Sequence, residues 1–228
     1  MKRLLFLILL FSLFGITGCS NKNNMPKNEE AAAISTKVEI SSEVKKLIPE
    51  GYHILQKSDD GQAIAEGNLN GDKFTDVALV IENDKDKDDR SLLIAFGNPD
   101  KTFSLSIKAD RAIMEIAEGG SFGDPFQGIK VDKGSLLLKF LGGSQRWHQY
   151  YRFRYQDDDW YLIGYTEGAY VSVGDTIEVL EKDFDLLTGD YTKDIIEEGK
   201  VKRTEDNRGK KQLMRLEDFD AGMTEAAF

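Results

Sequence analysis

The sequence predicts a mainly β fold, built as an antiparallel meander or sandwich or as propeller-like sheets, with one short N-terminal helix. Short apolar or alternating segments recur from residue 51 onward, and clusters of Gly, Asn and Asp separate them. Such spacing is typical of antiparallel strands joined by tight turns. A chain of this length accommodates one such domain more readily than two. We therefore expect a single globular domain over residues 41–228.

The first residues have the pattern of an export signal. Lys2 and Arg3 precede an apolar run over residues 4–14, and small residues then lead to a lone cysteine, Cys19. The run is shorter than the roughly 20 apolar residues that a membrane-spanning helix needs. Residues 1–18 are therefore predicted to be a signal peptide that is removed.

The residues at the end of this signal, Ile16, Thr17, Gly18 and Cys19, resemble the lipobox of bacterial lipoproteins. The resemblance implies cleavage before Cys19, lipidation of Cys19 and attachment to a membrane, with the protein facing the periplasm or the cell exterior. The alternative is an ordinary secretory signal with an incidental cysteine, although such signals favour an Ala-x-Ala-like end. Residues 19–40, rich in Asn, Lys, Glu and Ala, are expected to form a flexible, lipidated tether.

The composition argues against several classes of function. The formal net charge is −10, so the chain as a whole lacks the basic surface that nucleic-acid-binding proteins use. Cys19 is the single cysteine of the sequence, and once it carries lipid no disulfide, thiolate metal site or catalytic thiol is expected. The expected partners are a membrane, reached through the lipid, and a protein or carbohydrate ligand, but not nucleic acid.

The domain is expected to begin with a helix over residues 41–48. Ser41 or Ser42 can cap this helix, and Pro49 ends it. The next strands are predicted at residues 51–57, 63–66, 76–82 and 91–96, with the last two forming a hairpin. The strand at 76–82 is nearly all apolar, which is typical of a strand covered on both faces.

The remaining strands are predicted at residues 102–107, 128–131, 135–141, 147–155, 160–165, 170–172, 176–180 and 194–202. Residues 111–117 fit the period of a strand and of a helix equally well. The charged run 202–211 is expected to be solvated, and residues 213–228 are expected to make a few packing contacts before fraying.

The strand at 147–155 alternates between two kinds of side chain. One face is aromatic and is the expected core face, with Trp147, Tyr151, Phe153 and Tyr155; the other carries His148, Tyr150, Arg152 and Arg154. Together with Arg146, the second face can bind an anion or a sugar. The alternative is a solvated sheet face whose charges neighbouring acids neutralise.

The stretch from Glu66 to Ile81 holds the candidate metal site. Side-chain oxygens recur at alternate positions and lead directly into an apolar strand, which is how a short loop surrounds a hard cation such as calcium. The predicted ligands are the side chains of Asn68, Asn70, Asp72 and Asp76 and the carbonyl oxygen of Phe74. The alternative is a polar β-turn, for which Asn-Gly is already a strong signal.

This stretch resembles the loop of FG-GAP and VCBS-type repeats, Asp-x-Asn-x-Asp-Gly-x-x-Asp followed by an apolar strand. It occurs once, and it departs from the pattern at two positions. Asn68 replaces the first Asp, which lowers the ligand charge. Lys73 replaces the Gly of the sharp turn; it adds a positive charge and cannot easily adopt the positive φ that Gly allows, so it is expected to strain the turn. The resemblance implies extracellular calcium binding, and the two departures imply weak affinity.

Residues 119–123, Gly-Gly-Ser-Phe-Gly, match the nucleophile-elbow pattern of serine hydrolases, with Ser121 as the nucleophile. Asp124 and Pro125 break the chain where a helix has to follow. His53 precedes the serine, against the Ser-acid-His order, and His148 lies in an expected strand too close behind it. A glycine-rich loop without catalysis is therefore expected.

The sequence as a whole predicts a lipid-anchored, extracytoplasmic binding or structural module without catalytic activity, with a weak calcium site at residues 68–76. It resembles single-domain bacterial lipoproteins. Two other functions remain open: an inhibitor or immunity-type surface lipoprotein, and a serine hydrolase that uses Ser121.

Overall fold

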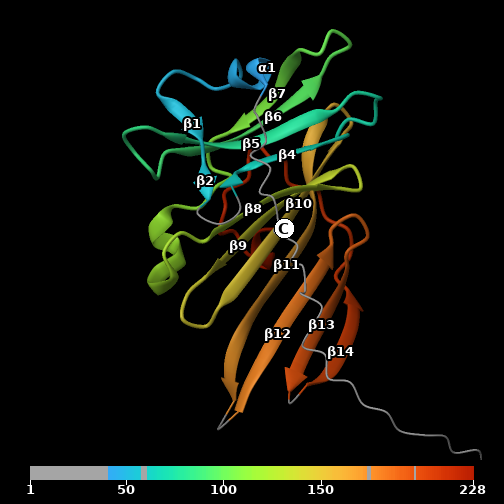
Figure 1. Cartoon of the computed structure of the whole chain (residues 1–228). Coiled ribbons are helices and arrows are strands. Elements are labelled where there is room, and N and C mark those ends of the chain that lie inside the picture. The colour runs from blue at the N-terminus through green and yellow to red at the C-terminus, as the bar shows by residue number, and fades with distance from the viewer. Residues whose placement is uncertain (1–40, 58–60, 174–175, 198) are drawn as a thin grey trace, which may run out of the picture. The chain divides into compact units, whose positions relative to one another are not determined.

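The computed structural model describes residues 41–57, 61–173, 176–197 and 199–228, which form a mainly β domain (Figure 1). The predicted signal peptide and tether, residues 1–18 and 19–40 with Cys19, lie outside the described residues. Most strands belong to two antiparallel sheets, one of five strands and one of seven. The remaining two strands form a separate hairpin. The predicted fold class is confirmed in its meander form.

The five-stranded sheet has the order β1-β5-β6-β7, and β4 pairs with β5 beside β1. Between β1 and β4 the chain leaves the edge of β5 to form the hairpin β2-β3, then returns, so that Leu55 and Ala63 flank Val80 through backbone hydrogen bonds of 2.9 Å. The strands are β1 Tyr52–Ile54, β2 Gln56–Lys57, β3 Gly61–Gln62, β4 Ile64–Gly67, β5 Asp76–Asn83, β6 Arg90–Gly97 and β7 Phe103–Ala109.

The seven-stranded sheet is a simple meander in which each strand pairs with its neighbours in sequence, in the order β14 to β8. A β-bulge interrupts the pairing of β10 with β11 after Arg152. The far ends of β11 to β14 extend beyond the five-stranded sheet (Figure 1). The strands are β8 Phe126–Asp132, β9 Ser135–Gly142, β10 Trp147–Gln156, β11 Asp159–Val173, β12 Thr176–Asp185, β13 Asp190–Glu197 and β14 Lys200–Asn207.

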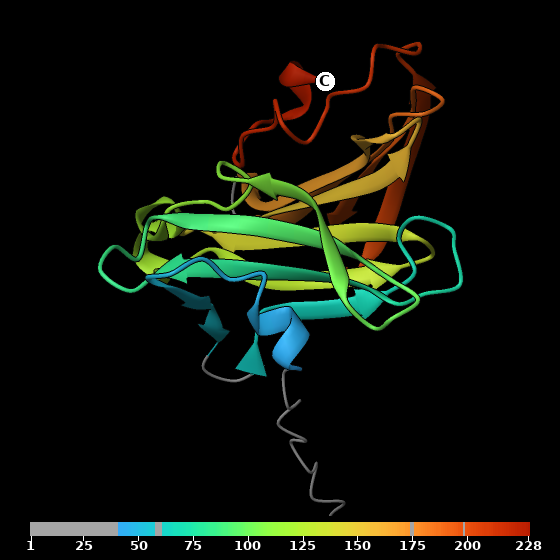
Figure 2. The ribbon, with the colours of Figure 1, turned by 90° about the horizontal axis from the view of Figure 1, so that it is seen from above.

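Both faces of the five-stranded sheet are covered, as the apolar sequence of β5 predicts. Ala78 and Val80 face the main core, which the two sheets share, whereas Val77, Leu79 and Ile81 face a second cluster that includes Val44 of helix α1, Ser42–Lys45. Figure 2 shows α1 on the side of this sheet opposite the seven-stranded meander. The predicted N-cap is confirmed, because Ser41 Oγ accepts a 3.2 Å hydrogen bond from the Val44 amide.

The inner face of the seven-stranded sheet forms the other wall of the main core. Tyr151 and Phe153 of β10 are fully buried there, and Trp147 and Tyr155 pack against the same core, so the predicted core face of this strand is confirmed. Trp160 of β11 reaches across to the five-stranded sheet, where its Nε1 donates a 3.0 Å hydrogen bond to Ser106 Oγ on β7.

Three expectations about individual segments are wrong. Residues 111–117 form neither a regular strand nor an α-helix; the chain enters a 3₁₀ helix, η1, Ile116–Phe122. The single strand expected at 194–202 is divided between β13 and β14, which pair with each other; the charged run that follows is solvated as expected, because all side chains of β14 are exposed. The chain end does not fray, because Leu216, Phe219, Ala221 and Phe228 are buried in the main core, and a short 3₁₀ helix, η2, Glu225–Ala227, precedes the last residue.

Candidate functional site

The Asn/Asp loop, residues 68–76, connects β4 to β5 and brings the predicted ligand residues together. Most of its polar side chains bond to the loop's own backbone. Asn68 Oδ1 accepts a hydrogen bond from the Gly71 amide at 2.7 Å, and Asn70 Oδ1 accepts one from the Asp72 amide at 3.0 Å. Asp72 Oδ1 accepts one from the Phe74 amide at 2.6 Å. Local bonds of this kind stabilise a turn without any ligand.

Asp76 differs from the other members of the loop because its side chain is fully buried. Its Oδ2 accepts hydrogen bonds from the amides of Leu69 and Asn70 at 2.6 and 3.2 Å, and its Oδ1 accepts one from the Gly97 amide at 3.0 Å. The carboxylate therefore ties the loop to the end of β6. Three backbone donors on one carboxylate account for its burial.

The sharp turn of the loop lies at a different residue from the one expected. Gly71 has the left-handed backbone, with φ of 83°, whereas Lys73 is not among the described residues with positive φ. The Lys73 ammonium lies 5.3 Å from the centre of the Phe74 ring. The expectation that Lys73 strains this turn is therefore wrong, and its effect on a cation is limited to its charge.

Across the described ranges, no three His, Cys, Asp or Glu side chains lie close enough together to hold a metal ion. A cation in the Asn/Asp loop would depend on the amide and carbonyl oxygens of Asn68, Asn70 and Phe74 beside the carboxylates of Asp72 and Asp76. Calcium accepts such mixed oxygen ligands. Calcium binding by this loop stays a prediction.

The glycine-rich stretch with Ser121 falls in η1, and Ser121 is exposed. Both histidines contact carboxylates elsewhere: His53 Nδ1 lies 2.8 Å from Asp84 Oδ1, and His148 Nε2 lies 3.5 Å from Glu181 Oε2. In the described part of the chain, no hydrogen bond joins Ser121 to either histidine. A serine nucleophile needs a base within hydrogen-bond reach.

The loop after η1 has a structural partner in the five-stranded sheet. Arg90, which is 3 % exposed, donates to Glu82 Oε2 through Nε and Nη2 at 3.0 and 2.7 Å, and to Asp124 Oδ2 through Nη1 at 2.8 Å. The buried guanidinium therefore fixes Asp124 against β5 and β6. Removing one member of such a buried group is costly, because the remaining charge is left uncompensated.

The predicted polar face of β10 lies on the side of the seven-stranded sheet that faces away from the main core. We call this side the outer face. It carries His148, Tyr150, Arg152 and Arg154, as the alternation predicts, all half-buried. Arg146 does not belong to it: this residue lies in the turn before β10, and its guanidinium lies over the Phe122 ring at 6.0 Å.

Charges are segregated along the outer face. Directly opposite residues on neighbouring strands share a face, so the strand registers assign each residue to its side. The basic half, on β8 to β10, carries Lys130, Lys139, Arg152 and Arg154, with Asp132 bound to Arg152 at 3.1 Å. The acidic half, on β12 to β14, carries Glu181, Asp183, Asp185, Asp190, Asp194 and Glu205, with Arg203 bound to Asp194 at 2.5 Å.

A hollow of about 340 Å³ lies where the two halves meet. Arg152 and Arg154 line it from the basic half, Asp183 and Asp185 line it from the acidic half, and Thr166 of β11 lies between them. Its apolar lining includes Leu137, Tyr150, Ile163 and Leu187. Charged groups of both signs around an apolar centre are typical of a surface that recognises another polar molecule.

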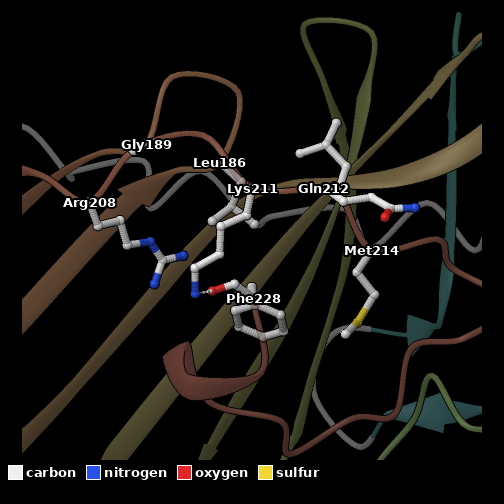
Figure 3. Close-up of a pocket in the computed structure, with 9 residues that line it drawn as sticks. Leu186, Gly189, Arg208, Lys211, Gln212, Met214 and Phe228 are labelled. Carbon is white, nitrogen blue, oxygen red and sulfur yellow. Dashed lines mark hydrogen bonds between the residues drawn. The ribbon is translucent and has the colours of Figure 1, made fainter.

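The pocket beside the chain end is too small to serve as a ligand site. Figure 3 shows it between Leu186, Gly189, Arg208, Lys211 and Phe228, where Lys211 Nζ donates a 2.6 Å hydrogen bond to the backbone oxygen of Phe228. Its volume is about 10 Å³, which is close to that of a single water probe. It is part of the packing of the C-terminal segment.

The acidic half was missed in the sequence, although a signal was present. Glu181, Asp183 and Asp185 recur with a period of two, which places them on one face of a strand. The equivalent residues of β13 and β14 could not be assigned from sequence, because their pairing depends on the hairpin turn near Gly199.

Comparison of the chain with protein-family models, curated proteins and solved structures gave no match. Within the described residues, none of the helices has the length and apolar character needed to cross a bilayer.

Proposed function

We propose that this protein is a lipid-anchored, extracytoplasmic binding module without catalytic activity, and that its binding surface is the outer face of the seven-stranded sheet. The lipid on Cys19 would supply the membrane attachment. The sheet would supply a rigid surface on which hydrogen-bonded strands hold the recognition side chains in fixed register.

The segregation of charge on the outer face carries this proposal. On a sheet face that is only solvated, opposite charges commonly lie on neighbouring strands and neutralise each other. Here, apart from the contacts of Arg152 with Asp132, Arg203 with Asp194 and His148 with Glu181, like charges gather. Lys139 and Arg154 make no ion pair with any described residue, and neither do Asp183 and Glu205 on the other half. A complementary partner would satisfy all four.

The proposal of a non-catalytic role rests on the surroundings of Ser121. The serine lies on the exposed η1 segment, the nearby loop is held by Arg90 and Asp124, and both histidines contact carboxylates. The function is therefore proposed to depend on recognition alone.

Site-specific photo-crosslinking in cells tests the binding surface. A photo-crosslinking amino acid replaces Lys139 on the outer face of the full chain, and in a matched control it replaces Lys101, in the exposed turn between β6 and β7. We expect a discrete crosslinked species from position 139 and none from position 101. The proposed binding surface is wrong if position 139 gives no crosslink, or if both positions give the same species.

A further inference from the structure

We infer that the partner of the outer face is a second copy of this chain, bound face to face as a symmetric dimer. This inference rests on the proposed function, because it names the partner of the same surface. It follows from the order of the charges across the sheet.

β11 is the central strand of the seven, with three strands on each side. The basic half lies on one side of it and the acidic half on the other. Consider a two-fold axis that runs along β11, midway between two facing sheets. This axis places β10 over β12 of the second copy, β9 over β13 and β8 over β14, so each basic half meets an acidic half. The contact is self-complementary, as a two-fold interface requires.

The strand registers allow the match to be followed row by row. A rotation about an axis parallel to the strands keeps each residue at its height along the sheet. Arg152, Gly164 and Asp185 lie in one cross-strand row, so Arg152 faces Asp185 of the second copy. The next row across the sheet contains, in order from β9 to β14, Lys139, Tyr150, Thr166, Asp183, Thr192 and Glu205. The basic end of this row, at Lys139, faces the acidic end of the same row in the other copy, which holds Asp183 and Glu205.

The central strand permits close approach along the axis. On the outer face β11 carries Gly164, Thr166 and Gly168, so no bulky side chain of β11 projects from these three positions. Farther along the same face, Tyr170 is 43 % exposed and lies near the axis, where it meets Tyr170 of the second copy. An exposed aromatic side chain at such a position is a typical interface contact.

The area of the outer face suits a stable dimer. Seven strands spaced about 4.8 Å apart and about seven residues long, at about 3.3 Å per residue, cover roughly 800 Å². A specific protein interface of standard size buries about 800 Å² on each partner. Other axes fail the charge test: an axis perpendicular to the strands places each strand over its own copy and brings like charges together.

Charge reversal tests the inference on the full chain, solubilised in detergent and studied by sedimentation. One variant carries Lys139→Glu and Arg154→Glu, and the other carries Asp183→Lys and Glu205→Lys. We expect the wild type to be a dimer and each variant alone to be a monomer, with a dissociation constant raised about a hundredfold or more, because like charges then face each other. Mixing the two variants should restore a dimer that contains one copy of each.

Two further variants serve as controls. The chain with all four substitutions should form a dimer again, because its halves have exchanged sign together. Lys87→Glu with Lys101→Glu makes the same change in net charge as the basic-half variant, on exposed turns of the five-stranded sheet, and should remain dimeric. If the dimer is restored on mixing, this also shows that the basic-half variant and the acidic-half variant are each folded.

The dimer is ruled out if the wild type sediments as a monomer at about 100 μM, or if the two variants do not recover association when mixed. The crosslinking experiment separates this outcome from failure of the proposed function. A species of twice the chain's mass supports the dimer. A species of another mass overturns the dimer but leaves the outer face as a binding surface, whether its partner is a protein or a carbohydrate.

Discussion

At the scale of single residues, Asp76 has the clearest consequence for stability. Its buried carboxylate accepts hydrogen bonds from three backbone amides, those of Leu69, Asn70 and Gly97. Asp76→Ala removes the acceptor and leaves buried donors unpaired, at about 1–3 kcal/mol for each unsatisfied group. We expect the free energy of unfolding to fall by about 3 kcal/mol or more, measured by urea denaturation.

The matched control for this prediction is Asp72→Ala, four residues earlier in the same loop. Asp72 is exposed, so its replacement should lower the free energy of unfolding by less than about 1 kcal/mol. Equal losses for the two variants would contradict the structural role assigned to Asp76.

The Asn/Asp loop also carries the calcium prediction. Calcium in the millimolar range should raise the melting temperature of the wild type, since a ligand that binds only the folded state stabilises it by about 1.4 kcal/mol at ten times its dissociation constant. Magnesium should have a smaller effect, because it demands a tighter octahedral geometry and retains its water. Asp72→Ala should abolish the calcium response by removing a carboxylate ligand.

Lys73→Gly provides the opposite test of the same site. Because Gly71 makes the left-handed turn, the gain expected from Lys73→Gly comes from removing a positive charge near the cation, and not from relief of strain. We expect a larger calcium-induced shift in this variant than in the wild type. Melting curves that calcium leaves unchanged in both chains would identify the loop as a polar turn alone.

At the scale of elements, the C-terminal segment seals a pair of tyrosines. Burial raises the pKa of Tyr151 and of Tyr165 well above the usual value. Tyr151 Oη donates to the Met223 carbonyl oxygen at 2.6 Å, and the Phe228 ring lies 5.1 Å from the Tyr165 ring. Residues 223–228 therefore help to keep both phenols away from water.

The raised pKa of these phenols makes stability depend on alkaline pH. The fold favours the neutral phenols, so their contribution is fully present below the pKa of an unfolded tyrosine, about 10, and is lost as pH rises above it toward the folded value. In an absorbance titration of the wild type, we expect Tyr151 and Tyr165 to ionise only as the chain unfolds, after the exposed tyrosines.

Phe228→Ala should bring the ionisation of these two tyrosines closer to the ordinary range, because it opens their aromatic cover. The exposed Ala226→Gly is the matched control in the same segment and should leave the titration unchanged. If Phe228→Ala titrates like the wild type, the chain end does not seal the pair.

The elements that were predicted correctly are those whose own sequence determines their surroundings. The alternation of β10 assigned its core and outer faces, the apolar run of β5 indicated cover on both sides, and Ser41 located the start of α1, although α1 ends at Lys45 and not at Pro49. β14 and the C-terminal segment were missed for a different reason. The charged strand β14 forms because it can pair with the edge of β13. Phe228 is buried because its ring packs against the rings of Tyr151 and Tyr165. Neither condition is local.

The candidate sites show the same division. The Asn/Asp loop was located from sequence because its residues are contiguous, but the burial of Asp76 depends on Gly97, which lies on another strand. The outer face was half predicted, since β10 was recognised alone. Its acidic half comes from three later strands, and only their registers bring Asp183 and Glu205 into one row.

At the scale of the whole molecule, Cys19 is predicted to decide where the protein is found. Cys19→Ala removes the residue that the lipobox resemblance assigns to the lipid, and several acyl chains on one residue give firm attachment. We expect wild type in the membrane fraction and the variant in the soluble extracytoplasmic fraction, both followed by immunoblotting. Equal retention of the two in the membrane pellet would contradict the lipid anchor.

The two sheets are predicted to unfold as one cooperative unit, because they share the main core. Leu92 of β6 is fully buried in that core, together with Leu138, Phe153 and Leu162 of the seven-stranded sheet. Leu92→Ala should lower the free energy of unfolding by about 3 kcal/mol through lost contacts and the cavity that remains.

The position of the tryptophans makes this coupling measurable. The chain has two, Trp147 on β10 and Trp160 on β11. Both belong to the seven-stranded sheet, whereas the substitution lies in the five-stranded one, and Trp160 also contacts that sheet through Ser106. We expect Leu92→Ala to shift the urea midpoints of tryptophan fluorescence and of far-ultraviolet circular dichroism together, as a two-state transition requires. A fluorescence midpoint that stays at the wild-type value while the dichroism midpoint falls would mean that the sheets unfold independently.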